Sequence, residues 1–78
     1  MTVTAYVLIQ TEVGRAEQVA SAARSIAGVI AADNVAGPYD VIVKAESGTL
    51  DDLGKLVMSA IQKVEGITRT FTCPIVNL

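Results

Sequence analysis

The chain is short and largely apolar: it has 78 residues, of which 51% are hydrophobic and 18% charged, and a net charge of −2. Without histidine, and with Cys73 as the one cysteine, a single chain cannot build a disulfide framework or a zinc site, and we expect neither metal nor cofactor. The six basic residues are scattered singly and no apolar run approaches the roughly 20 residues of a membrane span, which argues against direct nucleic-acid binding and against a membrane segment.

The first part of the chain predicts a strand, a helix and a second strand. Residues 3–10 are rich in β-branched side chains, which favours a strand. Residues 15–27 place apolar side chains at the i, i+3, i+4, i+7 spacing of an amphipathic helix. Gly28 stands where a helix C-terminal glycine belongs, and residues 29–35 predict the second strand.

The segment AGPYDVIV, residues 36–43, predicts a hairpin turn directly before a third strand over residues 41–46. Two turn registers fit it. With Pro38 and Tyr39 in the centre the turn is of type I, since proline favours the first central position. With Gly37 and Pro38 in the centre it is of type II′, since glycine accepts the positive φ. Either register gives a stiff loop, because proline fixes its own φ.

The remaining residues predict a second helix and a last strand. Thr49 and Asp52 resemble a capping box at the start of the helix, and apolar residues then recur on one helical face as far as Val64. Gly66 ends this helix, and residues 67–76 predict the strand. The segments SIAGVI and KVEGIT each combine a helix end, a glycine and a strand start, so the chain contains two similar halves.

The predicted order of elements is β-α-β-β-α-β, which indicates an α+β ferredoxin-like sandwich with four antiparallel strands and both helices on one face. The other face has no helix to cover it, although its strands carry apolar side chains such as Tyr6 and Leu8. A short chain also buries a smaller fraction of its surface than a long one. We therefore expect a single domain, residues 1–78, that forms a cytoplasmic homo-oligomer through this face.

The available side chains favour binding over catalysis. Without histidine the commonest general base is missing, and Ser/His/Asp or Cys/His machinery cannot be assembled, so we expect no enzyme. At the turn, Asp40 offers an acceptor for an ammonium group and Tyr39 offers an amphipathic wall. The alternative is a purely structural turn, in which Tyr39 covers the edge of the core and Asp40 hydrogen-bonds its own loop.

Alternation in the last strand separates hydroxyl side chains from larger ones. One face carries Thr68, Thr70 and Thr72, and the other carries Ile67, Arg69, Phe71, Cys73 and Ile75. Threonines suit an exposed strand and also form a ladder of hydroxyls that donate and accept hydrogen bonds. If the Phe71 side packs on the helices, with Cys73 as a small buried apolar residue, the hydroxyls point at a partner. A pocket between subunits could then combine the loop of one chain with the hydroxyls of another.

The element order, the hairpin AGPYDVIV and the ending VEGITRTFT together resemble the effector-binding domain of the Lrp/AsnC regulators, also called the RAM domain, over residues 5–76. The resemblance implies dimers whose sheets face each other as an α/β barrel and which associate further into tetramers, octamers or similar rings. It also implies amino-acid effectors bound where dimers meet. Carried over onto this chain, it assigns effector contacts to the loop and to the last strand: Gly37, Tyr39, Asp40, Thr70 and Thr72.

Full-length members of that family carry an N-terminal helix-turn-helix domain, whereas this sequence starts at the first predicted strand. The resemblance therefore implies a stand-alone sensor of amino acids or related small metabolites, acting in the transcriptional regulation of amino-acid metabolism without direct DNA contact. Two alternatives stay open. One is a ligand-independent assembly partner of full-length Lrp/AsnC regulators, and the other is a small enzyme on the same dimeric α/β-barrel scaffold.

Overall fold

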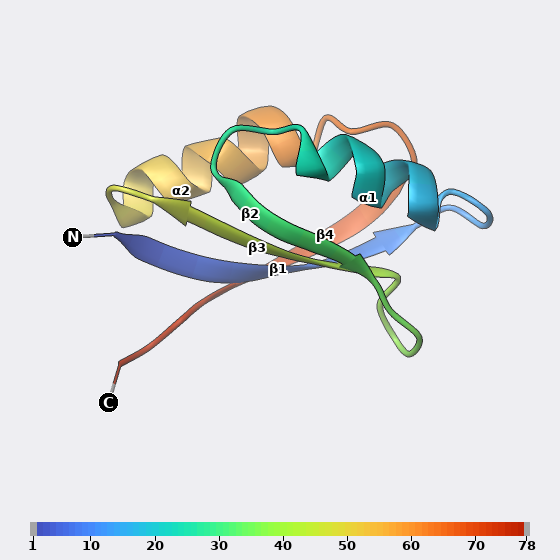
Figure 1. Cartoon of the computed structure of the whole chain (residues 1–78), viewed down its shortest axis with the longest axis horizontal. Coiled ribbons are helices and arrows are strands. Elements are labelled where there is room, and N and C mark those ends of the chain that lie inside the picture. The colour runs from blue at the N-terminus through green and yellow to red at the C-terminus, as the bar shows by residue number, and fades with distance from the viewer. Residues whose placement is uncertain (1, 78) are drawn as a thin grey trace.

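A computed structural model describes residues 2–77 as one antiparallel sheet with two helices on one of its faces (Figure 1). The predicted α+β ferredoxin-like fold is confirmed. In chain order the elements are β1 (Val3–Thr11), α1 (Ala16–Arg24), β2 (Val29–Asn34), β3 (Val41–Ser47), α2 (Leu50–Leu56), the π-helical turn η1 (Val57–Ile61) and β4 (Ile67–Pro74).

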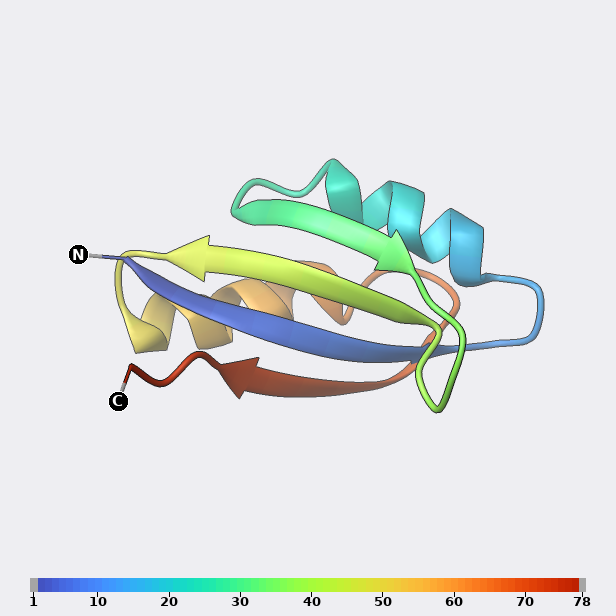
Figure 2. The same ribbon diagram turned by 60° about the horizontal axis from the view of Figure 1, so that its bottom comes forward.

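The strands are ordered β2-β3-β1-β4, so the first strand is central, while β2 and β4 form the two edges (Figure 2). All three strand pairs are antiparallel. Between β1 and β4, Leu8 lies opposite Phe71 and Ile9 lies opposite Thr70. Side chains of directly opposite residues point to the same face of a sheet, so this register decides which β4 side chains face the helices.

The core lies between the sheet and the helices and is built from aliphatic side chains. Alternate residues of β1 and β3 point into it, as expected for strands with one face on a core. Ile9, Leu53 and Ile61 are fully buried, and each such burial favours folding by about 1.5–3 kcal/mol. The whole buried set is Ala5, Val7, Ile9, Val19, Ala20, Ala23, Ala32, Val41, Val43, Ala45, Leu53, Val57 and Ile61.

The second helical segment begins at the predicted cap, but it ends at Ile61, before Gly66, where the sequence predicts its end. The Thr49 hydroxyl accepts a hydrogen bond from the Asp52 N–H at 3.1 Å and so caps α2. Gly66 has a φ of +99°, and a β-carbon there would lie 3.1 Å from the Arg15 β-carbon. Glycine is therefore required for both conformation and space. Between these signals the apolar spacing predicts a continuous α-helix, but the last part is the π-helical turn η1.

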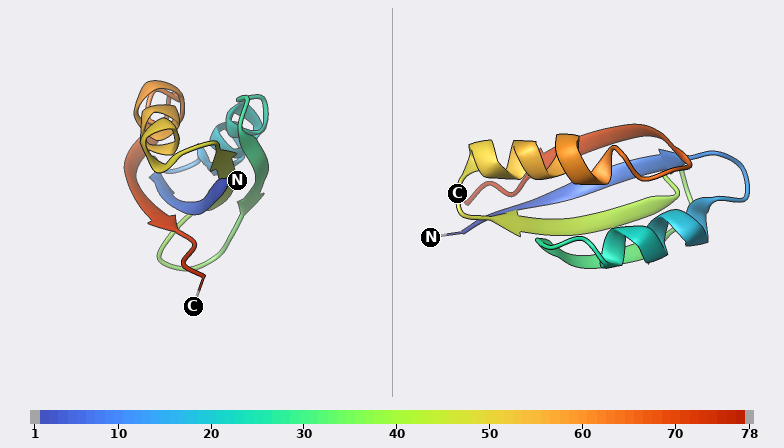
Figure 3. Two further views of the ribbon diagram at one scale, coloured as in Figure 1. Left: turned by 90° about the vertical axis from the view of Figure 1, so that its left-hand side faces the viewer. Right: turned by 90° about the horizontal axis from the view of Figure 1, so that it is seen from above.

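The sheet face away from the helices, called the open face below, is uncovered within one chain (Figure 3). Tyr6 and Phe71 are 42% and 40% exposed there, and Leu8 and Ile42 pair on it between β1 and β3. Cys73 lies opposite Tyr6 and is exposed, so the expectation that it is buried is wrong for the single chain. No helix in the described part of the chain combines the length and the hydropathy needed to cross a bilayer.

Candidate functional site

The hairpin loop, residues 35–40, projects from one end of the sheet to the side of the open face (Figure 1). Neither predicted tight turn is found, because residues 35–40 contain no hydrogen-bonded turn. Instead, the Val35 N–H donates to the Asp40 carbonyl at 3.0 Å and encloses a longer segment. Pairing with β1 accounts for this: the Asp40 N–H donates to the Ile9 carbonyl at 2.9 Å, so the chain joins β1 only after a wider loop. Gly37 adopts a φ of +139°, a conformation that favours glycine.

Asp40, one of the predicted effector contacts, is already hydrogen-bonded within the single chain. Its Oδ2 accepts from the Thr11 N–H at 2.8 Å and from the Thr11 hydroxyl at 3.3 Å. The carboxylate therefore fastens the hairpin loop to the end of β1. The sequence suggested a contact with a ligand or with its own loop, and neither describes this bond. A further contact from Asp40 to an effector stays a prediction.

Residues outside the predicted set complete the anchoring of the hairpin loop. Gln10 donates from Nε2 to the Pro38 carbonyl at 3.0 Å. The Tyr39 and Phe71 rings pack edge to face, with centroids 5.8 Å apart and an interplanar angle of 74°, and the Arg69 guanidinium lies 5.3 Å from the Phe71 centroid. The signal for Gln10 in the sequence is weak: it is a polar side chain at the end of a mixed strand face. A loop anchored in this way loses little further freedom when it binds a partner.

The predicted threonines lie on the other face of the sheet from the one expected. Thr70 lies opposite Ile9 and Thr72 lies opposite Val7, and both of these β1 side chains are buried beneath the helices. Phe71, between the two threonines, points to the open face. The conditional expectation that the Phe71 side of β4 packs on the helices is therefore wrong.

Two of the three β4 threonines, Thr68 and Thr70, border a small hollow beside the end of η1, whereas Thr72 does not line it. It measures about 230 Å³ and is lined by Gln62, Ile67, Thr68, Arg69 and Thr70. Gln62 Nε2 donates to the Thr70 hydroxyl oxygen at 2.9 Å, and the Thr68 hydroxyl donates to the Gln10 carbonyl at 3.2 Å. The predicted site residues of one chain are thus divided: Tyr39 packs against Phe71 on the open face, and Thr70 lies on the helix side.

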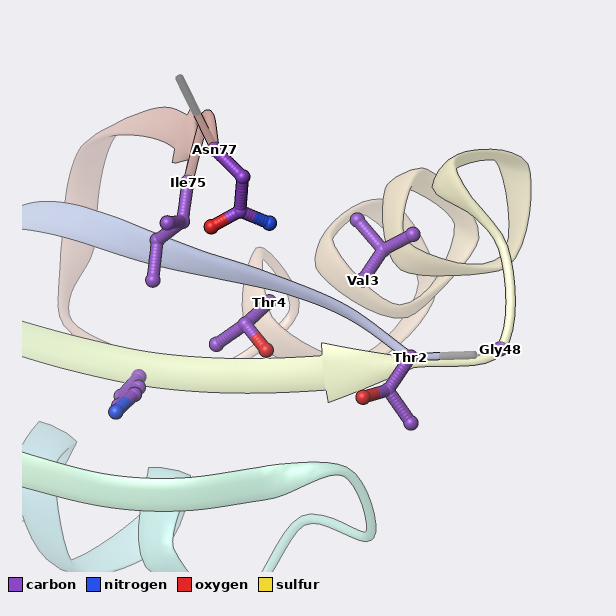
Figure 4. Close-up of a pocket in the computed structure, with 7 residues that line it drawn as sticks. Thr2, Val3, Thr4, Gly48, Ile75 and Asn77 are labelled. Atoms are coloured by element: carbon purple, nitrogen blue, oxygen red, sulfur yellow. The ribbon is translucent and has the colours of Figure 1, made fainter.

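A second hollow, of about 440 Å³, lies at the other end of the open face. It is lined by Thr2, Val3, Thr4, Lys44, Gly48, Ile75 and Asn77, and contains none of the predicted site residues. Figure 4 shows Ile75 and Asn77 beside Thr4. The Lys44 ammonium lies 5.9 Å from the centroid of the Tyr6 ring. Within residues 2–77, no three His, Cys, Asp or Glu side chains are grouped to hold a metal ion.

The fold and the site define a small ferredoxin-like domain with an anchored hairpin loop and an uncovered sheet face. The family model described as the Lrp/AsnC ligand binding domain matches residues 4–77. The chain therefore belongs to this family, and the family suggested by its motifs is confirmed. Its members are ligand-binding domains of transcriptional regulators.

Relatives and solved structures agree with this assignment. An uncharacterised helix-turn-helix transcriptional regulator of Pyrococcus furiosus is 32% identical over 76 residues, which cover 88% of this chain and 48% of the relative. The chain thus spans about half the length of this curated relative. A hypothetical protein from Pyrococcus horikoshii is 33% identical, with a TM-score of 0.88 over 100% of this chain and 93% of its own. A Thermus thermophilus protein is 28% identical, with a TM-score of 0.90 over 97% of this chain and 95% of its own.

One more distant structure shares the fold and carries a ligand. It is a feast or famine regulatory protein from M. tuberculosis in complex with L-methionine, 19% identical, with a TM-score of 0.81 over 97% of this chain and 51% of its own. At this identity the likeness concerns the fold alone. The methionine belongs to that protein.

Proposed function

We propose that this chain is a cytoplasmic effector-binding and oligomerisation domain for amino acids or related small metabolites, acting in the transcriptional regulation of amino-acid metabolism. The effector is held at the interface between dimers, by Gly37, Tyr39 and Asp40 of one hairpin loop and by Thr70 and Thr72 of another chain. Membership of the ligand-binding family supports this function, and the methionine complex of a protein with the same fold makes an amino acid the first ligand class to test.

The observation that carries the proposal is the division of the predicted site within one chain. Tyr39 contacts Phe71 on the open face, while Thr70 lies opposite the buried Ile9 on the helix side. This division favours a ligand that lies between the loop of one chain and the hydroxyls of another. The loop is held by Asp40 and Gln10 before any ligand arrives, so the ordering cost of binding is small.

Titration of the wild-type chain with the twenty amino acids, by thermal shift and calorimetry, tests the ligand part. At a ligand concentration 100 times the Kd, binding to the folded state alone adds about 2.7 kcal/mol of stability, which is a large thermal shift for a small domain. Tyr39→Ala should abolish this ligand-dependent shift. Val13→Ala, at a fully exposed position outside the site, is the control and should keep it. If no amino acid at millimolar concentration stabilises the wild type, an amino-acid effector is refuted.

The open face supports the assembly part of the proposal. Its exposed apolar side chains, which include Tyr6, Phe71 and Ile75, lie on a sheet that no helix covers, and such patches mark interfaces. We expect light scattering to find dimers or larger rings at micromolar concentration. Tyr6→Asp should shift the population toward monomer, because it places a charge in the interface, whereas Val13→Asp should not. A wild-type monomer under these conditions would contradict the assembly.

One observation favours a second function, a ligand-independent assembly partner of full-length Lrp/AsnC regulators. The Asp40 carboxylate already binds Thr11, so a loop of this kind can be maintained for structural reasons alone. Under this reading, the chain co-purifies with a full-length relative in the absence of amino acids, and added amino acids leave the complex unchanged. Complex formation that depends on an amino acid would exclude it.

A further inference from the structure

The π-helical turn η1 brings a glutamine to the edge of the sheet. In this turn the Gln62 N–H donates to the Val57 carbonyl at 2.8 Å, a step of five residues in place of the four of an α-helix. Such turns are rare and occur frequently at functional sites. Gln62 closes η1, and its side-chain amide reaches the Thr70 hydroxyl of β4 at 2.9 Å. The departure from the predicted helix therefore coincides with a contact to a predicted effector residue.

This contact fixes the direction of the Thr70 hydroxyl. A threonine hydroxyl has one hydrogen to donate and two lone pairs that accept. Because the Gln62 amide donates to this oxygen, the hydroxyl hydrogen points elsewhere and is available to an acceptor. The Thr68 hydroxyl has the opposite role, because it donates its hydrogen to the Gln10 carbonyl and its lone pairs remain available to accept a hydrogen bond. The hollow beside β4 is bordered by both residues, so it presents a donor beside an acceptor.

We infer that Gln62 is a positioning residue that presents the Thr70 hydroxyl as a donor to the carboxylate of a free amino acid, with the Thr68 hydroxyl accepting from its ammonium group. The inference rests on the proposed function and adds to it Thr68 as a further contact and the ligand group that meets Thr70 and Thr68. A carboxylate accepts without donating, and hydrogen bonds to it are stronger than hydrogen bonds to neutral acceptors. The hollow therefore selects the free acid over its carboxamide.

The test compares the affinities of the twenty L-amino acids with those of their α-carboxamides by calorimetry, in the wild type and in matched variants. For any amino acid that binds, we expect the wild type to favour the acid over the amide by about tenfold, the effect of one charge-assisted bond. Gln62→Glu offers Thr70 an acceptor and a negative charge, so the Thr70 hydroxyl should donate to the introduced carboxylate and no longer to the ligand. The ratio of acid affinity to amide affinity should then fall to about one or below. Gln18→Glu, the same exchange on α1 at a residue that contacts Arg15, should leave it unchanged.

Thr70 supplies the second pair of variants. Thr70→Val removes the hydroxyl at nearly constant shape and should abolish the preference, while Thr70→Ser keeps the hydroxyl and should retain it. A merely structural role for Gln62 would lower the affinity for acid and amide alike and leave their ratio unchanged. Gln62 is exposed, so we expect Gln62→Glu to fold, as its stability by thermal denaturation should confirm.

The possible outcomes distinguish this inference from the proposed function on which it rests. A wild type that binds no amino acid and no amide overturns both. A wild type that binds an amino acid while Gln62→Glu and Thr70→Val keep its acid-to-amide ratio overturns the inference alone. The inference is supported if these two variants lose the preference for the acid over the amide while Gln18→Glu and Thr70→Ser retain it.

Discussion

Replacing Asp40 with alanine should destabilise the folded chain in the complete absence of effector. The substitution removes the acceptor for the Thr11 N–H at 2.8 Å and for the Thr11 hydroxyl at 3.3 Å. A donor left without its partner costs about 1–3 kcal/mol when buried. Both residues are half-buried, so water replaces part of the loss, and we expect a decrease of about 1–2 kcal/mol in the free energy of unfolding. For a domain of this size that lowers Tm by roughly 5–15 °C.

Urea denaturation at one fixed protein concentration measures this loss, because oligomer stability depends on concentration. Asp40→Asn keeps one side-chain oxygen that can accept from the Thr11 N–H, so it should lose less than Asp40→Ala. Asp33→Ala removes the same charge from an exposed strand position and should change stability little. The reasoning fails if Asp40→Ala unfolds at the same urea concentration as Asp33→Ala, since the Thr11 contacts would then carry no net stability.

Three further substitutions test the packing and the glycines. Ile61→Ala, at a fully buried position between η1 and the sheet, should cost about 2–5 kcal/mol through lost burial and the cavity left behind; a loss below about 1 kcal/mol by denaturation would show that the site collapses. Gly54→Ala should raise Tm by a few degrees, because α2 gains helix propensity of about 1 kcal/mol and a β-carbon there meets nothing within 4 Å. Gly66→Ala should lower Tm, since φ is +99° and the new β-carbon approaches Arg15; equal Tm values for the two glycine variants would refute this contrast.

The fold could be predicted from the sequence because the local signals in the sequence agree with one another. The alternating strands, the apolar stripe that includes Leu53 and Ile61, and the glycines in the connections from helix to strand all specify the same arrangement. Ala5, Val7 and Ile9 form a uniformly apolar face of β1, and this face is the core. Agreement across levels of this kind is what makes a sequence specify one structure.

The orientation of β4 could not be predicted from the sequence, because both faces of the sheet carry apolar side chains. Residues such as Phe71 and Ile75 are more hydrophobic than the threonines between them, which favours placing them under the helices. The open face is also apolar, however, and β4 is an edge strand. Hydrophobicity identifies which side chains share a face but does not say which of two apolar surfaces they join. Pairing with β1 decides it, through the alignment of Phe71 with Leu8.

The hairpin loop and η1 were missed for a similar reason. Turn residues such as Gly37 and Pro38 predict a reversal of the chain, but the length of the loop depends on where Asp40 meets β1. The apolar stripe predicts a helix, but it does not distinguish an α-helical turn from a π-helical one. In the hairpin loop, the bond between Asp40 and Ile9 of β1 overrides the local turn preference. The five predicted site residues were proposed as one interchain set, and the structure adds Gln10 and Gln62 as their neighbours.

The central position of β1 has a consequence for how the chain reaches its structure. Among the described residues β1 is the first element in sequence, and it pairs on one side with β4, so Ala5 meets Pro74 across a long stretch of chain. Pairings between such distant segments make folding slow, because a long loop must close before the contacts form. Until β4 arrives, one edge of β1 offers unpaired backbone groups to any strand that fits it. If copies of this chain assemble as proposed, the nearest such strand is β4 of a neighbouring chain, so the same topology that completes a monomer would also permit strand exchange between subunits.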